Sequence, residues 1–199
     1  SDDWIWYRSS SWFTNDFYDG SPYASPGYFT EFTEGEGWFS PYIARGVTRT
    51  FKMPTEHYNP LGPLAEYEFL LFGKSDPTNP GDIVDGLNHE TQLKINGKVV
   101  FTQKFRGFKK ILQRDTIAPS EIGSATTDFN FASIYLSRSR HAVSYLLVDY
   151  PRHLTLDGSS QFAWDYTGSN DYFKFSNYPN GKNQPLVYDI ANNRRIIGS

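Results

Sequence analysis

The sequence of 199 residues contains no cysteine, a single methionine and no apolar run long enough to span a membrane as a helix. The absence of cysteine excludes a disulfide framework, a thiolate metal site and a cysteine nucleophile. The chain starts Ser1-Asp2-Asp3, without a basic segment followed by an apolar one. We therefore expect that a signal peptide has been removed or was never present.

Aromatic residues, by contrast, are abundant: five Trp, 14 Tyr and 16 Phe make up 18% of the chain. Disordered chains are poor in such residues, so we expect a folded protein. The length fits one domain, and we predict a single domain over residues 1–199. Without disulfides, its stability must come from packing.

The charges are unevenly distributed, although the net charge is only -3. Residues 1–40 contain one basic and seven acidic residues, whereas residues 94–114 contain seven basic residues and no acidic one. This asymmetry predicts an anionic partner or protein–protein contacts through residues 1–42 and 94–114. Alternatively, the two segments neutralise one another within one fold. A nucleic-acid partner is not expected, because the pI is near 5.8.

Residues 1–42 hold 14 of the 35 aromatic residues, interleaved with Ser, Gly, Pro and Asp. We predict an irregular aromatic wrap or arm with short strands. Trp4, Trp6, Trp12 and Trp38 are candidates for stacking on sugar rings, or for anchoring a protein interface, where Trp is enriched. We expect Trp4, Trp6 and Trp12 to be substantially buried, against the sheets or against another chain.

Beyond residue 42, short segments with β-branched and aromatic alternation predict strands, and no helical period of useful length occurs. Asn96-Gly97 lies between two such segments and predicts a hairpin. Many strands joined by long loops indicate an all-β sandwich or jelly roll. The predicted strands are residues 46–53, 65–72, 91–95, 99–105, 129–136, 142–150 and 172–178, with a short turn near 119–122.

The last of these strands, with the sequence YFKFSNY, is the most informative segment. Alternation along a strand places Tyr172, Lys174 and Tyr178 on one face and Phe173 and Phe175 on the other. A phenol beside an ammonium can donate or accept a proton, because the cation favours the phenolate. The alternative is an amphipathic strand whose polar face meets solvent.

This segment resembles the C-terminal signature strand of the jelly-roll polysaccharide lyases, including the YFKAGxY motif of the alginate lyase family. Those enzymes carry two earlier motifs, R-[ST]-E-L and Q-x-H. Here Arg49-Thr50-Phe51-Lys52 takes the place of the first, with Phe51 in place of Glu. Leu87-Asn88-His89 takes the place of the second, with Leu87 in place of Gln. The order of the three segments is that of the family.

The resemblance implies β-elimination on a uronate-containing, acidic polysaccharide, without a metal or other cofactor. Arg49 would neutralise the substrate carboxylate, so that charge developing at the neighbouring carbon is tolerated. Tyr178 and His89 would transfer protons. Tyr172, Lys174 and Asn88 would bind the substrate. An extracellular location is favoured.

Two alternatives to the lyase stay open. The chain is then a non-catalytic glycan-binding module on the same fold, or a structural or assembly subunit that uses its aromatic arm and basic patch as interfaces. His89 is itself ambiguous. If residues 87–95 form one strand, His89 shares a face with Leu93 and Ile95 and belongs to the core. A role in catalysis requires a bulge or loop near Asp85-Gly86.

Overall fold

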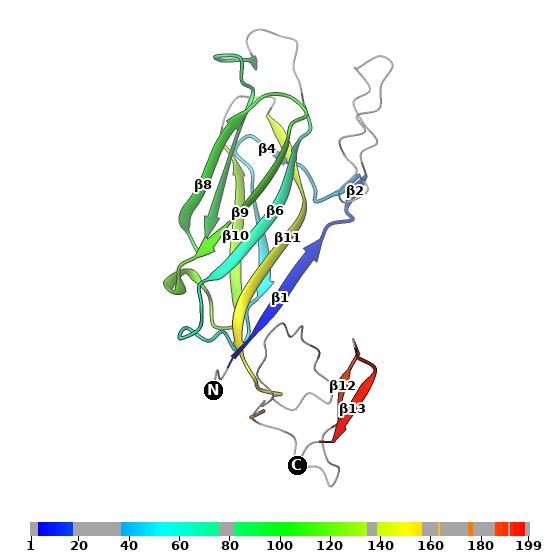
Figure 1. Ribbon diagram of the computed structural model, residues 1–199. Coiled ribbons are helices and arrows are strands. Elements are labelled where there is room, and N and C mark those ends of the chain that lie inside the picture. The colour runs from blue at the N-terminus through cyan, green and yellow to red at the C-terminus, as the bar shows by residue number, and fades with distance from the viewer. Residues whose placement is uncertain are drawn as a thin grey trace.

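The computed structural model describes residues 4–17, 37–75, 82–134, 139–156, 163, 175–176, 186–190 and 192–197. These residues form a β-sandwich of two antiparallel sheets packed face to face (Figure 1). The predicted all-β sandwich is therefore confirmed. No helix among the described residues is long and apolar enough to cross a membrane.

One sheet has the strand order β1-β11-β6-β9, with β4 also pairing β11, and the other has the order β5-β10-β7-β8. Two two-stranded sheets, β2-β3 and β12-β13, pair only within themselves among the described strands. The bounds of the strands are β1 Trp4–Trp12, β2 Asp16–Phe17, β3 Trp38–Phe39, β4 Ile43–Ala44, β5 Thr48–Pro54, β6 Ala65–Gly73, β7 His89–Ile95, β8 Lys98–Phe105, β9 Lys110–Ile117, β10 Thr126–Ser133, β11 Arg140–His153, β12 Leu186–Asp189 and β13 Arg194–Ile197.

The core lies between the two sheets and consists of the inward side chains of alternating positions. Phe69 of β6 meets Phe131 of β10 edge to face, with ring centroids 4.9 Å apart. Tyr67 lies parallel to Phe69 on the same strand and contacts Phe129 of the opposite sheet. Large aromatic side chains thus supply the packing that a chain without disulfides needs.

The hairpin predicted at Asn96-Gly97 joins β7 to β8. Both turn residues have positive φ, 44° and 89°, as a type I′ turn requires. A Cβ at Gly97 would meet no atom within 4 Å, so only the backbone conformation opposes a side chain there. We expect Gly97→Ala to lower the free energy of unfolding by about 1 kcal/mol. A denaturation midpoint equal to that of the wild type would contradict this expectation.

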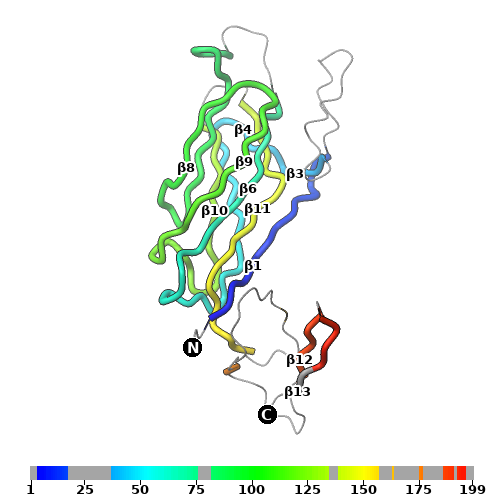
Figure 2. The backbone as a smooth tube through the Cα atoms, viewed as in Figure 1, coloured from blue at the N-terminus to red at the C-terminus, as the bar shows by residue number. Residues whose placement is uncertain are grey.

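The first part of the predicted N-terminal wrap is instead a regular strand. β1 pairs β11 along its whole length, from Trp4 opposite His153 to Trp12 opposite Tyr145. Figure 2 shows β1 starting where β11 ends, at one end of the sandwich. In the sequence of β1, the alternation of apolar and polar residues that is typical of a strand is hard to recognise. Trp residues occupy outward positions, and three serines follow one another.

Strand β9 was not predicted from the sequence, but it pairs β6 over eight residue pairs, from Ala65 opposite Ile117 to Phe72 opposite Lys110. Its inward side chains include Ile111 and Ile117, whereas most of its other residues are polar. The YFKFSNY segment, which we predicted as a strand, lies mostly outside the described residues. Of its two predicted core rings, Phe175 is half-buried and Phe173 is not described.

Candidate functional site

The six residues of the predicted lyase site divide into two groups. Tyr172, Lys174 and Tyr178 lie outside the described residues. Arg49, Asn88 and His89 are described, and they lie in or beside one sheet.

Asn88 and His89 are completely buried, and their polar atoms bond within the protein. The Asn88 Nδ2 donates to the Ser75 carbonyl oxygen at 2.9 Å, and its Oδ1 accepts the Gly107 N–H at 2.8 Å. The His89 Nε2 lies 2.8 Å from the same Ser75 oxygen, and Nδ1 lies 3.1 Å from the Ser139 hydroxyl. Asn88 therefore joins the end of β6 to the turn between β8 and β9.

Arg49 also differs from the predicted geometry. Its partner across the ladder is Phe131, a core residue, so Arg49 starts on the inward face of β5. Its Nε donates to the Tyr42 carbonyl oxygen at 3.4 Å. Arg49, Asn88 and His89 thus do not line an open sheet face in the way that the lyase hypothesis expected. Their roles in elimination stay predictions, because the other half of the predicted site is not described.

A second buried histidine lies beside His89. His141 of β11 is completely buried, with its ring centroid 6.5 Å from that of His89, and neither of its nitrogens has a hydrogen-bond partner. Burial, and to a lesser extent His89, lower the pKa of His141 from 6.5 to about 3. The imidazole is therefore neutral at pH 7. Among the described residues, no three His, Asp or Glu side chains are grouped as metal ligands.

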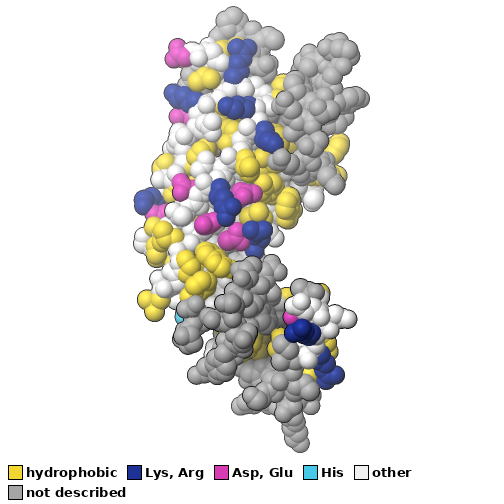
Figure 3. Space-filling model, in the orientation of Figure 1, with side chains coloured by type: hydrophobic (Ala, Val, Ile, Leu, Met, Phe, Trp, Pro, Cys, Tyr) yellow, Lys and Arg dark blue, Asp and Glu magenta, His cyan; other side chains and the backbone are white. Residues whose placement is uncertain are grey.

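The outward side of the five-stranded sheet differs from an ordinary solvent face, and we call it the β1–β9 face. It consists of the outward side chains of β1, β11, β6 and β9. The ladder places Trp12 beside Tyr145 and Leu70 beside Leu112 at one level. In the same orientation, Figure 3 shows charged side chains beside one another halfway down the molecule, with hydrophobic ones on either side.

The charged part of the β1–β9 face is internally paired. The Arg8 guanidinium donates to both carboxylate oxygens of Asp149, at 2.7 and 2.8 Å. Arg114 of β9 donates twice to Glu66 of β6, at 3.0 and 2.5 Å. The Arg8–Asp149 contact is bidentate, the geometry that holds such an exposed pair in place, whereas the Nε and Nη2 of Arg114 both donate to Oε2 of Glu66. Together they form a polar band across the four strands.

Trp12 projects from the β1–β9 face next to this band. Its side chain is 58% exposed although its ring lies against Tyr145, with centroids 4.7 Å apart. Tyr145 is buried, and its hydroxyl donates to Glu68 Oε1 at 2.9 Å. Trp12 is therefore an exposed indole that packs against the buried ring of Tyr145, and this contact fixes its orientation. The prediction that Trp12 is buried is not met within this chain, whereas Trp4 and Trp6 are partly buried.

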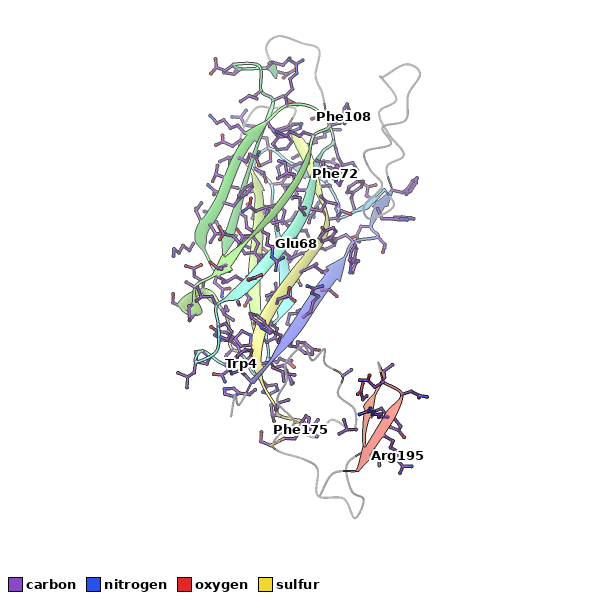
Figure 4. The ribbon with its side chains drawn as sticks, in the orientation of Figure 1. Trp4, Glu68, Phe72, Phe108, Phe175 and Arg195 are labelled. Atoms are coloured by element: carbon purple, nitrogen blue, oxygen red, sulfur yellow. The ribbon has the colours of Figure 1, made fainter. Side chains whose placement is uncertain are left out.

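A second apolar cluster holds this end of the face together. Phe39 of β3 covers Phe72 of β6, with ring centroids 5.2 Å apart, and Phe108 packs against the same cluster. Figure 4 shows Phe72 and Phe108 beyond Glu68 at this end of the sheet, and Trp4 at the opposite end. Further large side chains are exposed on the two-stranded sheet β2-β3, among them Phe17 and Trp38, whose ring centroids are 5.0 Å apart.

The outward side of the other sheet has a different composition. Thr50 of β5 bonds Asn130 of β10 there, at 2.6 Å, and Lys52 lies opposite Asp128. The outward positions of β5, β10 and β7 carry no aromatic residue: Thr48, Thr50, Lys52, Pro54, Thr126, Asp128, Asn130, Ala132, Glu90, Gln92 and Lys94. These three strands therefore have no counterpart of the exposed Trp12 on the β1–β9 face.

The predicted basic patch of residues 94–114 does not form one surface. Lys94 lies on β7 in one sheet and Arg114 on β9 in the other. Arg114 is paired with Glu66, and Lys98 with the buried Glu121. The segment thus contributes to at least two faces, which weakens its case as a single anionic-ligand site.

Comparisons with known proteins identify no family. No protein-family model and no curated protein matches the chain. One similar solved structure is dimeric latent PorU from Porphyromonas gingivalis, at 14% identity and a TM-score of 0.49, covering 77% of this chain and 13% of that one. Another is the CBM36-1 domain of a multidomain xylanase from the hindgut metagenome of Trinervitermes trinervoides, at 11% identity and a TM-score of 0.38, covering 72% of this chain and 96% of that one. At such identities, neither similarity bears on what this chain binds.

Proposed function

We propose that this protein is a non-catalytic glycan-binding module and that its binding site is the β1–β9 face around Trp12. The observation that carries the proposal is the exposed indole of Trp12, supported by Tyr145 and lying next to a band of ordered polar side chains.

This arrangement suits the chemistry of sugars. A pyranose ring has an apolar C–H face that can lie on an aromatic ring, and a rim of hydroxyl groups that needs hydrogen-bond partners. Aromatic side chains contribute large contact areas at binding sites, and a few ordered polar groups fix the orientation of the ligand. The tilt of Trp12 against Tyr145, and the hydroxyl bond of Tyr145 to Glu68, order the indole before a ligand arrives.

Among the contacts of the described residues, none favours elimination over binding. Asn88 and His89 are buried and bonded within the fold, whereas Trp12 is exposed. An absorbance assay for unsaturated uronates on alginate and glucuronan separates the two functions. We expect no increase in absorbance from polymers that the protein binds, and a sustained increase would overturn the non-catalytic assignment.

Trp12→Ala tests the proposed site. We expect a loss of roughly tenfold to a hundredfold in affinity for the polysaccharide that binds best, which is the usual effect of truncating a central aromatic contact. Affinity electrophoresis against glucans, xylans, mannans and alginate would identify that polysaccharide, and calorimetry would measure the loss. Trp12→Phe, which keeps a ring, should retain most of the affinity.

The matched control is Tyr188→Ala, which removes another exposed aromatic side chain, 64% exposed, from the β12-β13 hairpin. This variant should bind like the wild type. Failure of the wild type to bind any of the four polysaccharide classes, or equal losses in Trp12→Ala and Tyr188→Ala, would refute the proposed function.

A further inference from the structure

We infer that the ligand is an extended, uncharged glycan chain that runs along β1 and makes a second stacking contact at Trp6. This inference rests on the proposed function and specifies the ligand class and the direction in which the ligand lies.

The first observation is the alternation of β1. Trp6 and Trp12 are six positions apart in the sequence, which is an even number, so both project from the β1–β9 face. Six residues of antiparallel strand span about 20 Å. Trp4 and Trp6 form an edge-to-face pair with centroids 5.8 Å apart, and both are partly exposed. The face therefore has an aromatic contact at each end of β1, too far apart for one sugar ring to reach both.

The second observation concerns the side chains between these contacts. Arg8 and Ser10, the outward residues that separate Trp6 from Trp12, are exposed and polar. Arg8 is held by two hydrogen bonds to Asp149, with its side chain 58% exposed, so its guanidinium is an ordered polar group of this surface. A glycan that follows β1 would meet the indoles of Trp6 and Trp12 at its two ends and hydrogen-bonding groups between them. Its sugar rings could stack on the indoles, and its hydroxyl groups could bond the polar side chains.

The third observation is the charge of the polar band. The band contains three carboxylates and two guanidinium groups, which give it a net charge of -1. These groups belong to Glu66, Glu68, Asp149, Arg8 and Arg114. Both guanidinium groups already bond carboxylates of the band. A uronate polymer would bring further negative charge to a surface whose cations are engaged, so the band disfavours acidic chains and is compatible with neutral ones.

The other occupant to consider is a strand of a partner protein. One edge of β1 has no partner strand among the described residues, and open edges can add a strand by main-chain hydrogen bonding. Such a partner would pair with the backbone of β1 and would not need the outward indoles. If the occupant is a protein strand, binding of the partner protein should survive both Trp12→Ala and Trp6→Ala. That result would overturn the inference.

The test is calorimetry with oligosaccharides of increasing length, from disaccharide to octasaccharide, prepared from the neutral polymer that the protein binds. We expect the affinity of the wild type to rise by about tenfold or more once the oligosaccharide is long enough to reach Trp6. Trp6→Ala should abolish this rise, so that the octasaccharide binds this variant no more tightly than the short oligosaccharides do. A far-UV circular dichroism spectrum like that of the wild type shows that the Trp6→Ala protein is folded.

The failures of the inference and of the proposed function are distinguishable. If Trp12→Ala weakens the binding of oligosaccharides of every length but the affinity of the wild type does not depend on their length, the proposed site is correct. The inference that the ligand extends along β1 is then wrong. If oligouronates bind more tightly than neutral oligosaccharides of the same length, the charge assignment is wrong. If no oligosaccharide or polysaccharide binds, the proposed function itself fails.

Discussion

Acidification from pH 7 to pH 5 should lower the free energy of unfolding by about 2 kcal/mol through His141 alone. Both nitrogens of this buried imidazole lack hydrogen-bond partners, so a proton would bring an unpaired charge into the core. Burial accordingly lowers the pKa of His141 to about 3 in the folded protein. In the unfolded chain the imidazole titrates near its ordinary pKa of about 6.5.

The sign follows from these two pKa values. Between pH 6.5 and pH 3 the unfolded chain binds a proton at this position and the folded protein does not, so each step down in pH favours unfolding. The stabilisation is fully present above pH 6.5 and is lost as the pH falls toward 3. Urea denaturation at several pH values measures the loss directly, provided that the slope with urea stays constant.

His141→Leu isolates the contribution of His141, because leucine has a similar volume and no polar atom to leave unpaired. We expect this variant to lose about 2 kcal/mol less than the wild type between pH 7 and pH 5. The control is His153→Ser, which removes an exposed imidazole from the same strand and leaves the buried His141 in place. Parallel pH profiles of the wild type and His141→Leu would contradict the prediction.

Alternation and turn residues were sufficient to predict the central strands of both sheets. The hairpin at Asn96-Gly97 has the positive φ angles that its residues favour. The sequence also indicated that His89 belongs to the core if its segment is one continuous strand, and the structure places it there. These features depend on neighbouring residues, which the sequence displays directly.

The features that were not predicted depend on partners distant in the sequence. β1 is a strand because β11 pairs with it, about 140 residues later, and that pairing leaves Trp12 exposed. The polar band likewise joins Arg8 to Asp149 and Glu66 to Arg114, contacts that no local pattern contains. One local signal was present. Trp4, Trp6 and Trp12 are separated by even steps of two and six positions, and such residues of a strand lie on the same face, so they could have been assigned to a common surface.

Asn88→Ala should lower the free energy of unfolding by about 2–3 kcal/mol, which decides whether this residue is structural. The variant leaves the buried Gly107 N–H without its acceptor and removes a donor to the Ser75 carbonyl oxygen. The site cannot relax easily, because a Cβ on Gly73 would already lie 1.9 Å from the Gly107 oxygen, so the two backbones are in close contact. Urea denaturation at pH 7 measures the loss.

The matched control is Asn130→Ala. Asn130 also has a side-chain hydrogen bond, from the Thr50 hydroxyl at 2.6 Å, but it lies on an outward sheet face where water can replace that bond. We expect a loss of no more than about 0.5 kcal/mol. A substrate-binding role for Asn88 makes the opposite prediction: wild-type stability together with weakened polysaccharide binding. Asn88 is buried, and both the nitrogen and the oxygen of its side-chain amide are hydrogen-bonded, so we expect the large loss of stability. Glycan binding per folded molecule should depend on Trp12 and not on Asn88.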